Sequence, residues 1–348
     1  AIWAIGTGIG KPSVALSEVG WTPENGLCMP QLTAKKYQLT FIAGVTMKVD
    51  DINFKFFHIN KWDNGEFKGD AISTTSELVK ISPDGNLGLE EGQKFERGGI
   101  YRFTVDVTKG NTKAVLTVEK VGKVDLPAPD IFFGNDKMEV TDTDIYKSDQ
   151  AFTQGQMITV TGIDNLNEWW IDPDFFEKQS DGALKFLPIN GDYRVTANAV
   201  LKYFSVMALK DGKPAKLQDD GTGAIWAIGK GIGKPSVASS EVGWEPGKAL
   251  CLAQVAPKKY QLTLKAGETL KTSGDPEVIS FKFFHQNDWG GEFGNYASNT
   301  LVEQLKLTGS GNLEMQDNKA FEEGAVYRFT IDVTNGNANA DLKVEKIN

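Results

Sequence analysis

An internal repeat is the feature that most constrains how this chain can fold. Three stretches recur at an offset of 223 residues, namely residues 1–6 at 224–229, Gly20-Trp21 at Gly243-Trp244, and residues 36–40 at 259–263. Two later stretches recur at offsets of 227 and 226, namely residues 54–58 at 281–285 and 101–108 at 327–334. The change of offset from 223 to 227 indicates a four-residue insertion in the second copy, near Thr272 to Val278. A fixed period marks repeated structural units, so the two outer segments are expected to share one fold.

The repeated segments carry the periodicity of β-strands. Tyr101, Phe103 and Val105 alternate with Arg102 and Thr104, which gives one apolar and one polar face at a period of two. Glycine, asparagine and aspartate separate such runs, as expected for turns between strands. Many short strands with turns at this spacing indicate a β-sandwich.

The segment between the two copies predicts a third, divergent sandwich. Pro127 and Pro129 favour an extended connection out of the first copy. Residues 156–162 and 192–195 then resemble strands of the outer copies. We therefore predict an all-β chain of three tandem immunoglobulin-like or carbohydrate-binding-module-type β-sandwich domains, at residues 1–122, 123–222 and 223–348, the last a close copy of the first.

Charge and cysteine content exclude several classes of function. The net charge of −9 with only four arginines argues against nucleic-acid binding. Cys28 and Cys251 occupy equivalent repeat positions, so neither has a partner in its own copy, and no zinc-ligand spacing is present. The Asp142 to Asp149 region lacks the EF-hand pattern. We predict neither a metal nor a cofactor.

No apolar run is long enough to cross a membrane, and no signal peptide is visible. The chain nevertheless opens directly on a strand-like stretch at residues 1–6. We therefore expect an upstream segment that carries a signal, an anchor or another domain.

Four tryptophans in loops are the candidate ligand-binding residues. Trp62 and Trp289 follow the aromatic strands at residues 54–57 and 281–284, and Trp21 and Trp244 follow the first strand of each copy. An indole face can stack on the apolar face of a sugar ring, and it can equally anchor its own loop to the core. If Trp21 and Trp62 approach each other, they could hold a curved glycan between them.

Polar residues flank these tryptophans in both copies. Asn60, Glu66, Asn287 and Glu292 could exchange hydrogen bonds with sugar hydroxyls, or they could turn and cap their own loops. The remaining tryptophans are weaker candidates. Trp3 and Trp226 lie within strands and are expected to pack, whereas Trp169 and Trp170 would face opposite ways, which leaves one exposed. The only histidines, His58 and His285, have no partner motif for a catalytic triad.

The combination of these motifs resembles a known family. Residues 281–283 (Phe-Lys-Phe), 287–290 (Asn-Asp-Trp-Gly) and 293–294 (Phe-Gly), together with the Gly-Trp pairs and the Ile-Trp-Ala-Ile-Gly opening, resemble tandem sandwich modules of the SusE and SusF type. The resemblance covers both outer copies well and the middle segment weakly. It departs where Phe57-His58 and Phe284-His285 stand in place of a common Arg-Ala.

The resemblance implies an outer-membrane, cell-surface lipoprotein of Bacteroidetes that binds polysaccharide or oligosaccharide without cleaving it, beside an outer-membrane glycan importer. We therefore expect a non-catalytic protein that binds a starch-like polysaccharide. Two alternatives stay open from the residues alone: a glycoside hydrolase, which needs two carboxylates across a cleft, and a purely structural or adhesive array of sandwiches.

Overall fold

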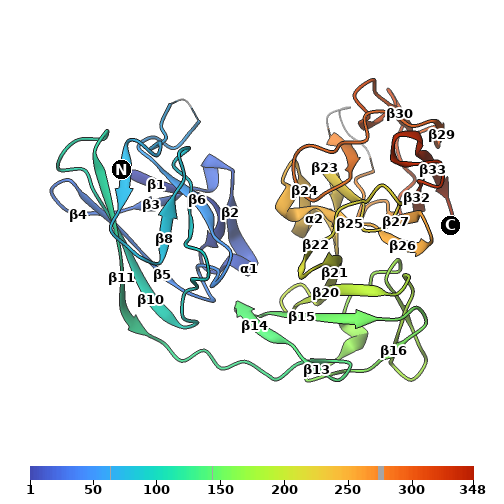
Figure 1. Ribbon diagram of the computed structural model, residues 1–348, viewed down its shortest axis with the longest axis horizontal. Helices are drawn as coiled ribbons and strands as arrows, with labels where there is room; N and C mark the ends of the chain where they lie inside the picture. The colour runs from blue at the N-terminus through green and yellow to red at the C-terminus, as the bar shows by residue number, and fades with distance from the viewer. Residues whose placement is uncertain (63, 143, 273–277) are drawn as a thin grey trace. The chain divides into compact units, whose positions relative to one another are not determined.

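The computed structural model describes residues 1–62, 64–142, 144–272 and 278–348, and it is built almost entirely of β-strands (Figure 1). The chain divides into two compact units. One comprises Ala1–Pro129 with Glu139–Tyr146, and the other comprises Asp130–Met138 with Lys147–Asn348. The all-β, multi-domain sandwich architecture predicted from the repeat is confirmed.

The first sandwich contains two sheets. One has the order β2-β1-β6-β9-β8, with β3 paired to β1, and the other has the order β4-β5-β10-β11-β7. The bounds in the first sheet are β1 (Ile2–Gly10), β2 (Glu18–Gly20), β3 (Leu27–Met29), β6 (Asn53–Phe57), β8 (Val79–Ile81) and β9 (Leu87–Leu89). Those in the second are β4 (Gln31–Thr33), β5 (Lys36–Ile42), β7 (Ile72–Thr74), β10 (Gly99–Asp106) and β11 (Ala114–Lys123). Two short helices, α1 (Val14–Ser17) and the 3-10 helix η1 (Pro23–Asn25), connect the early strands.

The third sandwich repeats this topology strand for strand. Its sheets have the orders β24-β23-β28-β31-β30, with β25 paired to β23, and β26-β27-β32-β33-β29. The first contains β23 (Trp226–Gly233), β24 (Glu241–Gly243), β25 (Leu250–Cys251), β28 (Ser280–Phe284), β30 (Leu305–Leu307) and β31 (Leu313–Met315). The second contains β26 (Ala253–Ala256), β27 (Lys259–Lys265), β29 (Ser298–Thr300), β32 (Val326–Asp332) and β33 (Asp341–Lys346). Its short helices are α2 (Val237–Ser240), η3 (Pro246–Lys248) and η5 (Asn337–Asn339).

The middle region, residues 130–217, is also β-structured. It contains β12 (Phe132–Phe133), β13 (Asp136–Lys137), β14 (Glu139–Asp142), β15 (Ile145–Phe152), β16 (Met157–Ile158), β17 (Val160–Thr161), β18 (Phe176–Lys178), β19 (Leu184–Phe186), β20 (Gly191–Asn198), β21 (Tyr203–Lys210), β22 (Lys213–Pro214) and the 3-10 helix η2 (Leu166–Glu168). Strands β15, β20, β21 and β22 follow one another in one sheet, and β16, β19 and β18 form another. Most of this region shares a compact unit with the third sandwich. The division into three domains at residues 122 and 222 stays a prediction.

Aromatic packing fixes β6, the strand from which the candidate loop of the first sandwich emerges. Phe54 and Phe56 are buried and meet edge to face at 5.6 Å. Phe54 also contacts Phe41 and Phe103 across the interior, with ring centroids 6.2 and 6.0 Å apart. Edge-to-face pairs at such distances are favourable because the positive ring edge meets the negative ring face. The strand is therefore a rigid base for the residues that follow it.

Two features are absent from the described residues. None of the helices in the described ranges has the length and apolar character needed to span a membrane. Across the same ranges, no group of three or more His, Cys, Asp or Glu could hold a metal ion. The predicted insertion near Thr272 to Val278 falls largely on residues 273–277, which lie outside the described residues.

Candidate functional site

A glycine in a left-handed conformation precedes Trp21 in the first sandwich. Gly20, the last residue of β2, has φ of +61°, a conformation that side-chain-bearing residues rarely adopt. Its counterpart Gly243 has φ of +58° and precedes Trp244. The Gly-Trp motif is thus explained locally, because the glycine supplies the turn and the tryptophan begins the loop.

The loop that carries Trp62 is closed by backbone hydrogen bonds at its base. The His58 amide donates to the Gly65 carbonyl at 2.7 Å, and the Phe67 amide donates to the Phe56 carbonyl at 2.9 Å. Glu66 then pairs with Phe57 as an isolated β-bridge. The loop is therefore a closed excursion from the end of β6, and Trp62 lies within it.

Trp21 and Trp62 lie next to each other. Their ring centroids are 6.2 Å apart and their planes are inclined by 33°. Trp62 also meets the buried Phe57 edge to face at 5.4 Å, yet 46% of its surface stays exposed. Both interpretations of the loop tryptophan therefore hold in part, since Phe57 anchors the indole while nearly half of it faces solvent.

The two indoles form one continuous surface and not a clamp. A sugar ring held between two aromatic planes needs about 7–8 Å between them, because carbon atoms in contact lie about 3.5–4.0 Å apart. The centroid separation of 6.2 Å between Trp21 and Trp62 is smaller than that. A glycan would lie across the pair, and the expectation that one is held between the rings does not fit this geometry.

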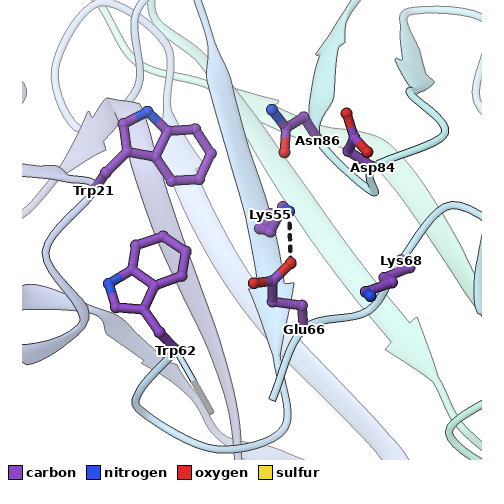
Figure 2. Close-up of a pocket in the computed structure, with 7 residues that line it drawn as sticks. All are labelled: Trp21, Lys55, Trp62, Glu66, Lys68, Asp84 and Asn86. Atoms are coloured by element: carbon purple, nitrogen blue, oxygen red, sulfur yellow. Dashed lines mark hydrogen bonds and ion pairs between the residues drawn. The ribbon is translucent and has the colours of Figure 1, made fainter. Parts of the chain in front are cut away.

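A polar wall faces this aromatic surface across an open hollow of about 480 Å³ (Figure 2). Lys55 points out of β6 into the hollow, and its Nζ lies 2.9 Å from the Glu66 Oε2. The Lys55 side chain is 9% exposed and that of Glu66 is 22% exposed. The ion pair therefore holds the Glu66 carboxylate in a fixed position opposite the indoles.

Three further residues of the hollow come from segments that sequence reasoning did not single out. Lys68 follows the loop, and Asp84 and Asn86 lie in the turn between β8 and β9. The Asn86 Oδ1 is buried and has no hydrogen-bond partner among the described residues. The turn recurs at residues 308–313, where Asn312 is the counterpart of Asn86. That recurrence is the feature of the sequence that could have identified Asn86.

Asn60, one of the predicted polar contacts, is placed elsewhere. The residues that line the hollow are Trp21, Lys55, Trp62, Glu66, Lys68, Asp84 and Asn86. The Asn60 Oδ1 is instead buried close to Gly26, at the end of η1. Of the four residues predicted in this copy, Trp21, Trp62 and Glu66 come together and Asn60 lies apart from them.

The third sandwich carries the same aromatic pair. The Trp244 and Trp289 centroids are 6.4 Å apart with planes inclined by 26°, and Phe284 meets Trp289 edge to face at 6.0 Å. Trp289 is 51% exposed. Its loop is closed by the His285 amide, which donates to the Gly291 carbonyl at 2.7 Å.

The polar surroundings differ between the two copies. Within the described ranges no ion pair joins Lys282 to Glu292, the counterparts of Lys55 and Glu66, and Glu292 is exposed. Asn287 is half-buried, and the Gln286 Nε2 donates to the Trp289 carbonyl at 2.7 Å. Gly294 and Ser310 replace Lys68 and Asp84 in the aligned sequence. The second aromatic pair thus lacks charged residues at the two positions aligned with Lys68 and Asp84.

The tryptophans of the middle region correct one expectation, because neither of them is exposed. Trp169 is 8% exposed and stacks on Phe204 at 4.5 Å. Trp170 is half-buried, and its Nε1 donates to the Glu268 Oε1 of the third sandwich at 2.6 Å. Both rings are used in packing within the second unit.

Two family models match the chain. Residues 1–108 and 220–334, more than half of its length, match a family described as Domain of unknown function (DUF5121). Residues 124–217 match a different family, described as Domain of unknown function (DUF5125). The two outer copies therefore share a family that the middle region does not. No curated protein matches the chain.

Proposed function

Since the chain belongs to the DUF5121 family, whose description names no activity, we propose from the site itself that the protein binds glycans without cleaving them. The binding surfaces are the paired indoles Trp21–Trp62 and Trp244–Trp289. The single observation that carries this proposal is that both pairs lie side by side with one ring about half exposed.

Exposed, adjacent indoles suit the chemistry of a sugar ring. A pyranose has an apolar face of C–H groups, and burial of apolar surface stabilises by about 25 cal/mol per Å². Specificity then requires a few well-placed polar groups beside an aromatic wall. The hollow beside Trp21 and Trp62 offers the carboxylate of Glu66 and the amide of Asn86.

The buried oxygen of Asn86 supports a ligand that donates hydrogen bonds. A buried acceptor without a partner costs about 1–3 kcal/mol. Asn86 lines the hollow and its Oδ1 has no partner among the described residues, so a sugar hydroxyl would satisfy that oxygen once the amide rotates toward the hollow. Binding would then recover a free-energy cost already present in the unliganded protein.

Two surfaces on one chain compensate for the weakness expected of each. Linked sites raise the overall affinity by about 10²–10⁴ over either alone when both can engage one ligand. A long polysaccharide is such a ligand. With the resemblance to SusE- and SusF-type modules, this supports a starch-like polysaccharide as the ligand and a place at the cell surface, as a lipoprotein beside a glycan importer.

Affinity electrophoresis with tryptophan variants tests the proposal. The probes are gels that contain amylopectin or one of several other bacterial, plant and host polysaccharides. We expect the native chain to be retarded by at least one of them, and Trp62→Ala combined with Trp289→Ala to abolish the retardation. Met157→Ala, which removes an apolar side chain that is 51% exposed on β16, is the matched control and should migrate like the native chain.

Three outcomes would reject the proposal or redirect it. Retardation that survives both this double variant and Trp21→Ala combined with Trp244→Ala would exclude the indoles as the binding surface. Steady release of reducing ends from a retarding polysaccharide would indicate a hydrolase. Failure of every gel to retard the native chain, with no saccharide-induced change in tryptophan fluorescence, would favour a structural or adhesive array.

A further inference from the structure

The third sandwich has a face to which the middle region is docked. This surface, called the docking face below, is formed by both sheets of the sandwich. It comprises six residues of β23, β25, β27 and the turn after β23, namely Trp226, Lys234, Cys251, Tyr260, Gln261 and Thr263. The middle region and the third sandwich belong to one compact unit. The contacts across this face are therefore part of a single packed structure.

Two aspartates of the middle region are the main polar contact of the docking face. The Lys234 Nζ lies 2.8 and 2.7 Å from the two carboxylate oxygens of Asp172 and 3.1 Å from Asp174 Oδ2. Thr263 donates to Asp174 through its amide and its hydroxyl, both at 2.6 Å. The Gln261 Nε2 donates to the same carboxylate at 2.8 Å. One cation, two amides and one hydroxyl thus receive two carboxylates spaced two residues apart.

Ring and thiol groups complete the contact. The Trp226 indole, 1% exposed, donates from Nε1 to the Ala215 carbonyl at 3.0 Å. The Tyr260 hydroxyl donates at 3.0 Å to the carbonyl of Gly221, which lies in the segment that joins the middle region to the third sandwich. Cys251 is buried, and burial raises the pKa of its thiol to about 12 because it disfavours the thiolate. A hydrogen bond with the Ala208 backbone lowers the pKa by a smaller amount.

The first sandwich has the same six residue types at the equivalent positions, and there they are open. The equivalents are Trp3, Lys11, Cys28, Tyr37, Gln38 and Thr40. Lys11, Cys28 and Thr40 are exposed, and Trp3, Tyr37 and Gln38 are half-buried. No described residue forms an ion pair with Lys11. Beside them, Leu32 is 63% exposed, whereas its counterpart Val255 is half-buried.

We propose that this open face of the first sandwich binds a partner protein through a β-structured module of the middle region's kind, whose turn presents an Asp-x-Asp pair to Lys11, Gln38 and Thr40. The charge complementarity is that of the occupied copy, where Lys234 receives Asp172 and Asp174. The apolar surface of Trp3 and Leu32 would be covered in the same contact.

A second copy of this chain does not fit as the occupant. Each chain has two such faces and one middle region, and the side chains of Asp172 and Asp174 are only 3% and 1% exposed because they already face Lys234. One difference narrows the partner further. Glu268, which accepts the Trp170 indole, is replaced by Val45 in the first copy. The partner module is therefore expected to have an apolar group where Trp170 stands.

The reactivity of Cys28 reports occupancy of the face. The probe is the full chain extended at its N-terminus by a second copy of residues 124–223, which reproduces the natural connection between residues 223 and 224. Such tethering gives a weakly bound module an effective concentration of about a millimolar. We expect a maleimide to modify Cys28 at least about tenfold more slowly in the extended chain than in the native chain, as an effective concentration well above the dissociation constant implies.

Two variants of the extended chain show whether the predicted contacts cause this protection. Lys11→Glu, at an exposed position, should restore fast modification of Cys28. Asp172→Asn with Asp174→Asn in the added copy alone should also restore it. Persistence of the protection in both variants would show that another surface covers Cys28 and would overturn the proposal.

Further outcomes would also overturn it. Protection below tenfold, with the added copy resistant to protease, would show that the face does not take this module. Digestion of the added copy by protease would also show that the face does not take this module. The tether places the added copy beside the same type of face that protects the natural copy, so a bound copy would resist digestion. Protection of Cys28 in the native chain that increases with protein concentration would identify a second copy as the occupant instead.

Discussion

Replacement of Lys234 by methionine is the most direct test of what holds the middle region on the third sandwich. The Lys234, Asp172 and Asp174 side chains are 2%, 3% and 1% exposed. Desolvation opposes the Lys234 cation, yet the two carboxylates outweigh it and raise the pKa of Lys234. Desolvation likewise opposes the Asp174 carboxylate, but Lys234 and the donors Gln261 and Thr263 lower its pKa. The charged forms of Lys234 and Asp174 are therefore favoured, whereas desolvation raises the pKa of Asp172 although Lys234 opposes that shift.

The expected loss of stability follows from what Lys234→Met leaves behind. Methionine fills much of the same volume, and volume-conserving changes cost less than about 1.5 kcal/mol. The larger cost is electrostatic, because Asp172 and Asp174 stay buried without their cation. Removal of one partner from a buried ion pair destabilises by about 3–5 kcal/mol. We expect a loss in that range for the second unit.

Lys11→Met in the first sandwich is the matched control. It makes the same chemical change at the equivalent position, where the lysine is exposed and has no ion-pair partner among the described residues. Surface substitutions of this kind change stability by no more than about 0.5 kcal/mol. Scanning calorimetry of both variants at neutral pH gives the two values. A loss of stability below about 1 kcal/mol for Lys234→Met would refute the reasoning, since removal of the cation from a buried carboxylate pair is expected to destabilise the protein by more than that.

Two further predictions concern the cysteines and the ion pair of the hollow. A maleimide at mildly alkaline pH should label only the exposed Cys28 in the folded native chain. It should reach Cys251 only after denaturation, because burial raises the pKa of that thiol to about 12. Mass spectrometry of the labelled peptides measures the labelling, and equal labelling of the two thiols would contradict the prediction. Lys55→Met should destabilise the first sandwich by about 1.5–3 kcal/mol, the range for a hydrogen bond to a charged group. Lys282→Met should change the free energy of unfolding by no more than about 0.5 kcal/mol. Thermal denaturation compares the two variants, and equal losses of stability would show that the Lys55–Glu66 pair has no special role.

The fold was predictable because its strands are half-buried and therefore alternate. Strand β10 reads buried, intermediate, buried, intermediate along Gly99–Asp106, which is the pattern inferred from Tyr101, Phe103 and Val105. The repeat then transferred this inference to β32 without further evidence. The two-residue strands of the middle region, β12, β13, β16 and β17, carry too few residues for a clear period, so they were outside the reach of sequence reasoning.

Residues in identical local sequence were the ones that sequence reasoning could not separate. Trp3 and Trp226 lie in the same Ile-Trp-Ala-Ile-Gly stretch, yet Trp3 is half-buried and Trp226 is 1% exposed. The difference comes from the middle region, whose Ala215 accepts the Trp226 indole. Local sequence determines the strand, whereas the environment of its outer face depends on a segment distant in the sequence.

The candidate site was predictable where its residues belong to a repeated motif, as Trp21 does in the Gly-Trp pair. Trp62 and Glu66 stand in one loop, so a sequence motif could identify them together. Lys55 was hidden because an alternating strand with buried phenylalanines on both sides gives no sign that its lysine reaches a surface hollow. Asn86 comes from a turn that lies beside the loop only after β6 pairs with β9.

If the aromatic pairs bind glycans as proposed, the differences between them imply that the two copies are not interchangeable. In the first copy the Lys55–Glu66 ion pair and the neighbouring Lys68 and Asp84 place four charged groups opposite the indoles. In the third copy, Gly294 and Ser310 remove two of these groups. Coulomb interactions of exposed charges weaken with salt, whereas apolar stacking does not. If both surfaces bind one polysaccharide, the first copy therefore distinguishes between sugars through its polar groups. The third copy adds contact area and is less selective for the arrangement of the sugar hydroxyls.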